Sequence, residues 1–149
     1  MKITAISISD RKGVRKDNVP SARLKADYGI ESDAHAGTAN RQVSLLAQES
    51  IDKMVEKGLD VTAGDFAENI TTTGIDLLRL PVGQPLLLGE EVLVEVSQIG
   101  KECHDRCAIY HEAGDCVMPK EGIFVKVLRG GTVHTGDAIT ILENDPHGH

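Results

Sequence analysis

Aromatic residues and positive charge are both scarce in this sequence. It contains two Tyr, two Phe and no Trp, so aliphatic side chains must supply most of the core and few platforms exist for stacking nucleobases. Binding to a phosphate backbone requires clustered Lys and Arg, whereas the formal net charge here is -7. A nucleic-acid partner is therefore not expected.

Long hydrophobic runs are also missing. No segment approaches the roughly 20 consecutive apolar residues that cross a bilayer. The first ten residues, MKITAISISD, lack the apolar segment of a signal peptide. We therefore expect a cytoplasmic protein without membrane contact.

Cysteine is limited to three residues, Cys103, Cys107 and Cys116. An odd number confined to one short stretch argues against the disulfide framework of a secreted protein. In a reducing compartment such a stretch instead suggests metal, cofactor or thiol chemistry.

The composition that is present fits a single globular domain. The chain has 149 residues, of which 40% are hydrophobic and 26% charged, and it shows no internal repeat or linker. A chain of this length buries enough surface to fold without metals or disulfides. We expect one domain over residues 1–149, with the polar residues 143–149 fraying as a tail.

Short β segments dominate the pattern. Residues 6–9 alternate between Ile and Ser, as in a half-buried strand. A single helix is expected at about residues 48–57, with Ile51, Met54 and Val55 on one face and Gly58 at its end. Further strands are expected near residues 22–24, 41–46, 70–73, 85–88, 92–96, 124–128 and 138–142, with a hairpin joining 85–88 to 92–96. This pattern predicts a mainly β, mostly antiparallel barrel with few short helices.

The cysteine stretch carries the strongest chemical signal. Cys103 lies between Lys101 and His104, and Cys107 follows Arg106. Cationic neighbours lower the pKa of a thiol, and the thiolate is both the nucleophile and the ligand that soft metals prefer. Cys103 and Cys107 are therefore candidate reactive residues.

Other interpretations of these cysteines stay open. One or two of them could be small buried hydrophobic residues. Three Cys and one His could complete a structural zinc site, although the third Cys stands alone, nine residues after the second. A redox disulfide could join Cys103 to Cys107, although the usual motif has two intervening residues rather than three.

Two polar segments earlier in the chain are further candidates. Asp33 and His35 could orient a proton donor or hold a metal, and Arg41 could clamp a phosphate; the alternative is a polar turn capped by Asp33. In residues 64–69, a Gly-Asp turn presents Glu68 and Asn69 before a strand. A basic stretch, Arg11, Lys12, Arg15 and Lys16, could contact a phosphate or simply be a solvated loop.

The order of these segments resembles the MOSC family, named for the C-terminal domain of molybdenum-cofactor sulfurases. The resemblance rests on residues 32–37 (SDAHAG), 41–46 (RQVSLL), 64–70 (GDFAENI), the Cys103 region and Gly136-Asp137. Ser32 departs from the family, which commonly has Gly there. The resemblance implies a pyruvate-kinase-type β-barrel.

The resemblance also implies a site. Either Cys103, after its Gly-Lys-Glu lead-in, or Cys107, in an Arg-Cys-Ala-Ile context, would ligate molybdenum or accept sulfur. The residues expected to bind the molybdenum cofactor are Asp33, His35, Arg41, Ser44, Glu68, Asn69 and His104. The family also includes fusions to a pyridoxal-phosphate desulfurase domain, which this sequence lacks, so pyridoxal phosphate enters only by family association.

Three functions follow from these observations. The first, implied by the resemblance alone, is a molybdenum-cofactor oxidoreductase that reduces N-hydroxylated compounds with electrons from a partner protein. The second is a persulfide carrier in cofactor assembly, supplied by a sulfur-donor protein. The third is a zinc-stabilised interaction domain.

Overall fold

The fold is built mainly from β-strands. The computed structural model describes residues 1–8, 17–31, 33, 37, 42–58, 60, 62–63, 68–99 and 122–142. Its strands are β1 (Lys2–Ile8), β2 (Asp17–Val19), β3 (Ser21–Lys25), β4 (Gly29–Ile30), β5 (Val43–Ala47), β6 (Ile70–Thr73), β7 (Pro85–Leu88), β8 (Val92–Ile99), β9 (Ile123–Arg129), β10 (Gly131–His134) and β11 (Ile139–Ile141). Its helices are α1 (Gln48–Glu56) and the 3-10 helix η1 (Leu77–Arg79).

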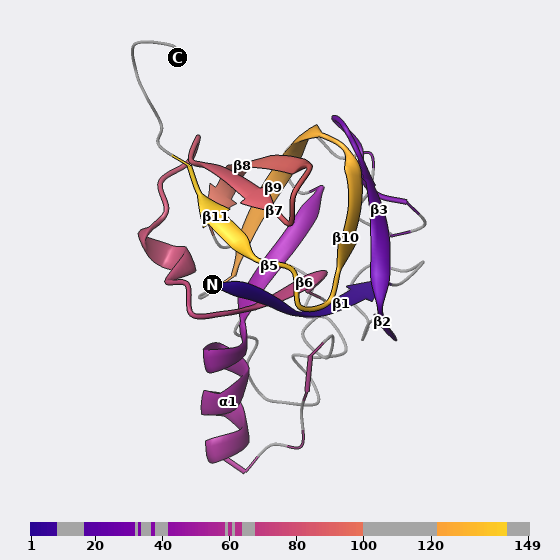
Figure 1. Cartoon of the computed structure of the whole chain (residues 1–149). Helices are drawn as coiled ribbons and strands as arrows, with labels where there is room; N and C mark the ends of the chain where they lie inside the picture. Colours follow the sequence, from indigo (N-terminus) through magenta and orange to yellow (C-terminus); the bar gives the residue numbers. More distant parts are fainter. Residues whose placement is uncertain are drawn as a thin grey trace.

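Two sheets organise these strands. The larger one has the order β11-β7-β8-β9-β5-β6-β1-β2, and the smaller one has the order β10-β3-β4. Within the larger sheet, β5 and β6 run parallel, while the other paired strands are antiparallel. Figure 1 shows the strands curling around a common interior, with α1 projecting from one end. The prediction of a mainly β, barrel-like fold is confirmed.

The interior is filled by aliphatic side chains from nearly every strand. Val43, Leu45 and Ala47 of β5 belong to this core, and they alternate with Ser44 and Leu46. Successive side chains of a strand point to opposite faces of the sheet. Ser44 and Leu46 therefore face away from the core, yet both are buried.

An irregularity in the pairing of β1 explains why two of its residues that strict alternation would place on opposite faces both lie in the core. Ile3 and Ile6 both belong to the core, although three positions separate them. The pairing of β1 with β6 shifts register between Ile3 and Ala5. A bulge of this kind adds one residue to one strand, and so returns both side chains to the same face.

The helix α1 confirms one prediction and corrects another. It begins directly after β5, packs against β5 and β6, and buries Ile51 and Met54 as expected. Val55 was expected on the same buried face, but it is 49% exposed. Gly58 follows the helix with φ of 92°, and its N–H donates to the Val55 carbonyl oxygen. No helix among the described residues is long and apolar enough to cross a membrane.

Candidate cofactor site

The segment that carries Asp33 is anchored to the turn between β3 and β4. The Asp33 N–H donates to the Ile30 carbonyl oxygen at 3.2 Å, and the Gly37 N–H donates to the Tyr28 carbonyl oxygen at 2.8 Å. Gly37 has φ of 86°, a conformation that glycine adopts without strain. Asp33 is almost completely buried. Of the other predicted residues in this region, His35 and Arg41 lie outside the described residues.

A second group of predicted residues meets where β5, β6 and β1 lie side by side. Asn69 immediately precedes β6, and its Oδ1 accepts hydrogen bonds from the Ser44 N–H at 3.0 Å and the Ser44 hydroxyl at 3.1 Å. Its Nδ2 donates to the Ser7 carbonyl oxygen at 3.2 Å. The backbone N–H of Asn69 donates in turn to the Ser44 hydroxyl oxygen at 2.9 Å. The structure therefore brings Ser44 and Asn69 into direct contact.

These bonds make the cluster a rigid junction. Ser7, Ser44, Glu68 and Asn69 are all buried. Most hydrogen-bonding capacity of the Asn69 side chain is used inside the protein, so it joins three strands through one amide. The Ser7 hydroxyl extends the network by donating to Asn18 Oδ1 at 2.7 Å, and Asn18 is exposed to solvent.

The face that carries this cluster is the one opposite the aliphatic core. Ser44 pairs with Phe124 of β9, and Phe124 is fully buried without belonging to the core cluster. Alternation places Thr71 of β6 on the same face as Asn69. The Thr71 hydroxyl is buried and has no hydrogen-bond partner among the described residues. Two buried layers thus flank this part of the sheet, one aliphatic and one partly polar.

Gln42 is a residue that the sequence reasoning missed. Its side chain is fully buried, donates from Nε2 to Asp27 Oδ1 at 3.2 Å, and accepts at Oε1 from the Val127 N–H at 3.0 Å. It therefore links the start of β5 to β9 and to the turn between β3 and β4. A polar residue directly before a buried strand was the available signal, because burial there requires partners.

The cysteine-bearing connection attaches next to this cluster. Ile99 at the end of β8 pairs with Ile123 at the start of β9, and Ile123 pairs with Leu45, the neighbour of Ser44. Residues 100–121, including Cys103, His104, Cys107 and Cys116, lie outside the described residues. Among the described residues, no group of three or more His, Cys, Asp or Glu could hold a metal ion.

Comparison with known proteins places this mainly β fold in a family. The model of the MOSC domain matches residues 32–140, a span that contains all the residues predicted for the site. The chain belongs to the MOSC domain family, which is associated with molybdenum-cofactor-related function.

Solved structures show the same fold at low sequence identity. YuaD from Bacillus subtilis superposes with a TM-score of 0.77 at 19% identity, covering 93% of each chain. YiiM from Geobacillus stearothermophilus gives 0.73 at 23% identity, over 95% of this chain and 75% of that one. YiiM from Escherichia coli superposes with a TM-score of 0.69 at 18% identity, covering 97% of this chain and 71% of that one. The comparison with curated protein sequences gives no match.

Proposed function

We propose that this protein binds the molybdenum cofactor through the thiolate of Cys103 or Cys107 and reduces N-hydroxylated compounds. The observation that carries the proposal is the match to the MOSC domain over residues 32–140, which includes both cysteines and the polar segments before them. When bound, the cofactor supplies two-electron redox chemistry at its metal. Reduction of an N–OH group consumes two electrons and two protons and yields N–H and water, with a partner protein as the electron donor.

The described residues fit a role in holding such a group. The cofactor presents the polar edge of its pterin and a phosphate group, and binding them requires hydrogen-bond donors and acceptors that are fixed in place. Ser44 and Asn69 form a rigid polar junction on the non-core face, and the buried Thr71 hydroxyl on that face has unused hydrogen-bonding capacity among the described residues. These features support a binding face beside β5 and β6.

Each candidate residue has a separate task in this proposal. The thiolate of Cys103 or Cys107 supplies a soft ligand to the metal. His104 directly follows Cys103 in the sequence. Arg41 pairs with the cofactor phosphate, assisted by the basic residues 11–16. Asp33 and His35 line the pocket, while Asn69 and Ser44 keep its supporting strands in place.

The connection between β8 and β9 is long enough to bring a cysteine to this face. Its second end, Ile123, pairs with Leu45, one residue beyond Ser44 along β5, and its first end, Ile99 of β8, pairs with Ile123. An extended chain spans roughly 3.3 Å per residue, so even the few residues between Ile99 and Cys103 can cover about 10 Å. The sequence distance therefore permits either cysteine to reach the polar junction.

Metal content tests the proposal directly. The protein is produced in a host that makes the cofactor, and molybdenum is measured in wild type and in Cys103→Ser, Cys107→Ser and Cys116→Ser variants. We expect molybdenum in wild type and in the Cys116 variant, and its loss in one of the other two. Fresh, folded wild-type protein without molybdenum would contradict the proposal, as would retention in both the Cys103 and Cys107 variants.

Mass spectrometry distinguishes the enzyme from a persulfide carrier. The carrier function predicts that Cys103 or Cys107 gains one sulfur atom, which a reductant removes, and that the protein reduces no N-hydroxylated compound. The proposed enzyme predicts bound molybdenum and no persulfide on either residue. The same preparations serve both measurements.

A further inference from the structure

The hydroxyl of Thr71 is buried and has no hydrogen-bond partner among the residues that the structure describes. Thr71 lies within β6, between Ala5 of β1 and Leu46 of β5. A buried hydroxyl without a partner costs free energy, whereas valine has nearly the same shape, the same preference for strands and no such cost. Packing of the described strands therefore gives this hydroxyl no role.

The neighbouring side chains on the sheet do not supply a partner for Thr71. Ala5 and Leu46, which flank it on the two adjacent strands, have only apolar side chains. Asn69, two residues earlier, directs the oxygen of its amide to β5 and the nitrogen to β1. The polar junction around Asn69 thus stops short of Thr71.

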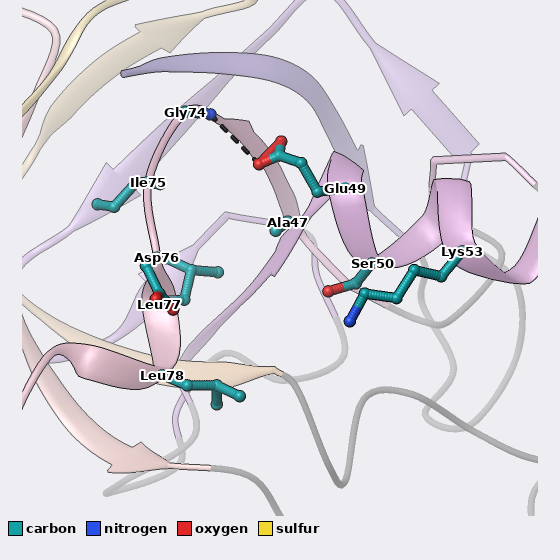
Figure 2. Close-up of a pocket in the computed structure, with 9 residues that line it drawn as sticks. All are labelled: Ala47, Glu49, Ser50, Lys53, Gly74, Ile75, Asp76, Leu77 and Leu78. Carbon is teal, nitrogen blue, oxygen red and sulfur yellow. Dashed lines mark hydrogen bonds between the residues drawn. The ribbon is translucent and has the colours of Figure 1, made fainter.

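The cavity beside α1 does not account for the hydroxyl either. This cavity, of about 360 Å³, lies between the first turns of α1 and the connection that follows β6 (Figure 2). Thr71 is not among the described residues that line it, whereas Ala47 at the end of β5 and Gly74 after β6 are. The Glu49 carboxylate on this side accepts from the Gly74 N–H at 3.4 Å. The side on which a partner can meet Thr71 is therefore the face that it shares with Asn69.

The next residue, Thr72, shows why the face matters. Its hydroxyl is also buried without a partner in the described part of the chain, but its side chain points to the opposite face, beside Ile3 and Ala47 of the aliphatic core. A close-packed core has no room for a ligand there. Thr71 instead lies roughly 7 Å along the strand from Asn69, on the same side. Of the two hydroxyls, only that of Thr71 is beside the proposed cofactor face.

We infer that the Thr71 hydroxyl hydrogen-bonds directly to the cofactor, at a polar atom of its pterin edge. This inference rests on the proposed function, and it adds a residue that neither the sequence nor the family resemblance indicated. A hydroxyl both donates and accepts, so it matches either kind of polar atom on that edge. Because Thr71 is fully buried, the group that bonds to it must itself be enclosed by the protein. A resident cofactor meets this condition, and a loosely bound surface solute does not.

Retention of the cofactor by variants of similar shape tests this contact without relying on activity. Wild type and the variants Thr71→Val, Thr71→Ser and Thr72→Val are produced in a host that makes the cofactor. The rate at which each protein releases the cofactor during dialysis is followed by the fluorescence of the oxidised pterin. Thr71→Val lacks one hydrogen bond to the cofactor and should release it about fivefold faster than wild type. Thr71→Ser keeps the hydroxyl and Thr72→Val changes only the core face, so both should release it at close to the wild-type rate.

Urea denaturation of the cofactor-free proteins separates this role from a structural one. Removing a hydroxyl that has no internal partner should not destabilise the fold, so Thr71→Val and Thr72→Val should each be at least as stable as wild type. A less stable Thr71→Val protein would overturn the inference, because its hydroxyl would then have a partner inside the fold.

The outcomes separate this inference from the proposed function. Wild type without bound pterin would overturn both. Pterin bound to wild type and released no faster from Thr71→Val would overturn the role of Thr71 alone. Release from Thr71→Ser or Thr72→Val as fast as from Thr71→Val would also overturn that role and leave the proposed function standing.

Discussion

Gln42 shows how one buried side chain can hold distant parts of this fold together. It contacts Asp27 in the turn between β3 and β4 and the backbone of Val127 in β9. The same turn holds Gly37 through the Tyr28 carbonyl oxygen, and β4, which follows it, holds Asp33 through the Ile30 carbonyl oxygen. Gln42 therefore fixes the position of the predicted cofactor segment relative to β5, and we class it as a positioning residue.

Replacing the neutral Gln42 side chain with a carboxylate tests this role. Gln42→Glu keeps the acceptor for the Val127 N–H but places a second carboxylate against Asp27, so the free energy of unfolding at neutral pH should fall by about 1–3 kcal/mol. Adding Asp27→Asn restores a donor and an acceptor and should recover most of the loss. Asparagine also tolerates the positive φ of 54° at this position.

Urea denaturation measures these differences. Asp27→Asn alone serves as the control and should be close to wild type, because an Asn carbonyl oxygen still accepts from Gln42. If the double variant were as unstable as Gln42→Glu, the contact with Asp27 would not be the cause.

At the scale of elements, the parallel pair β5 and β6 is the least expected feature of the sheet. Parallel strands need a crossover, which α1 and the following connection provide between Ala47 and Ile70. Asn69 closes this arrangement by bonding to both β5 and β1. The Asn69 side-chain amide thus adds to the backbone hydrogen bonds that join Ser7 and Ser44 to Asn69.

Replacing that amide should loosen three strands together. Asn69→Ala leaves the buried Ser44 N–H and Ser7 carbonyl without these partners, and we expect a loss of about 2 kcal/mol or more. Amide hydrogen exchange should accelerate most in β5 and β6 and least in β11.

The matched control for this change is Asn18→Ala. Asn18 also bonds to Ser7, but it is exposed, so water can replace it and the expected loss is below about 1 kcal/mol. Equal losses in the two variants would show that Asn69 contributes no more than a surface contact.

Elements with strong local patterns were predictable from the sequence, and those defined by pairing partners were not. The hairpin of β7 and β8, the helix α1 and strands β6, β9 and β11 lie close to where the sequence predicts them. The short strands β2, β4 and β10 were not predictable, because each contains Gly, Asp or Asn, which are depleted in strands. The register shift between Ile3 and Ala5 of β1 could not be predicted from the sequence either, because it depends on how β1 pairs with β6.

The candidate site stays a prediction, although the structure describes some of its residues. The family resemblance indicated Ser44 and Asn69, and the structure places them in contact. It also indicated Asp33 and Glu68, which are both buried. Gln42 was missed because its partners, Asp27 and Val127, are distant in the sequence. No local pattern reveals such contacts.

At the scale of the whole molecule, the described core consists entirely of Ile, Leu, Val and Ala. Hydrophobic burial of this extent is the dominant stabilising contribution in a domain of this size.

Metal removal should therefore leave the fold intact. We expect the urea midpoint of the protein, followed by circular dichroism, to be the same with and without a strong chelator. A zinc-stabilised domain would instead unfold when its metal is removed. A clear drop in the midpoint on chelation would support the zinc interpretation of the cysteine stretch.

The pairing of Ile99 with Ile123 has a consequence for how this protein can diverge. The 23 intervening positions connect two neighbouring points of the sheet, as an insertion between two paired strands. Doubling the length of such an insertion costs only about 0.6 kcal/mol of closure entropy. The cysteine-bearing stretch can thus change in length and sequence at little cost to the sheet that carries it.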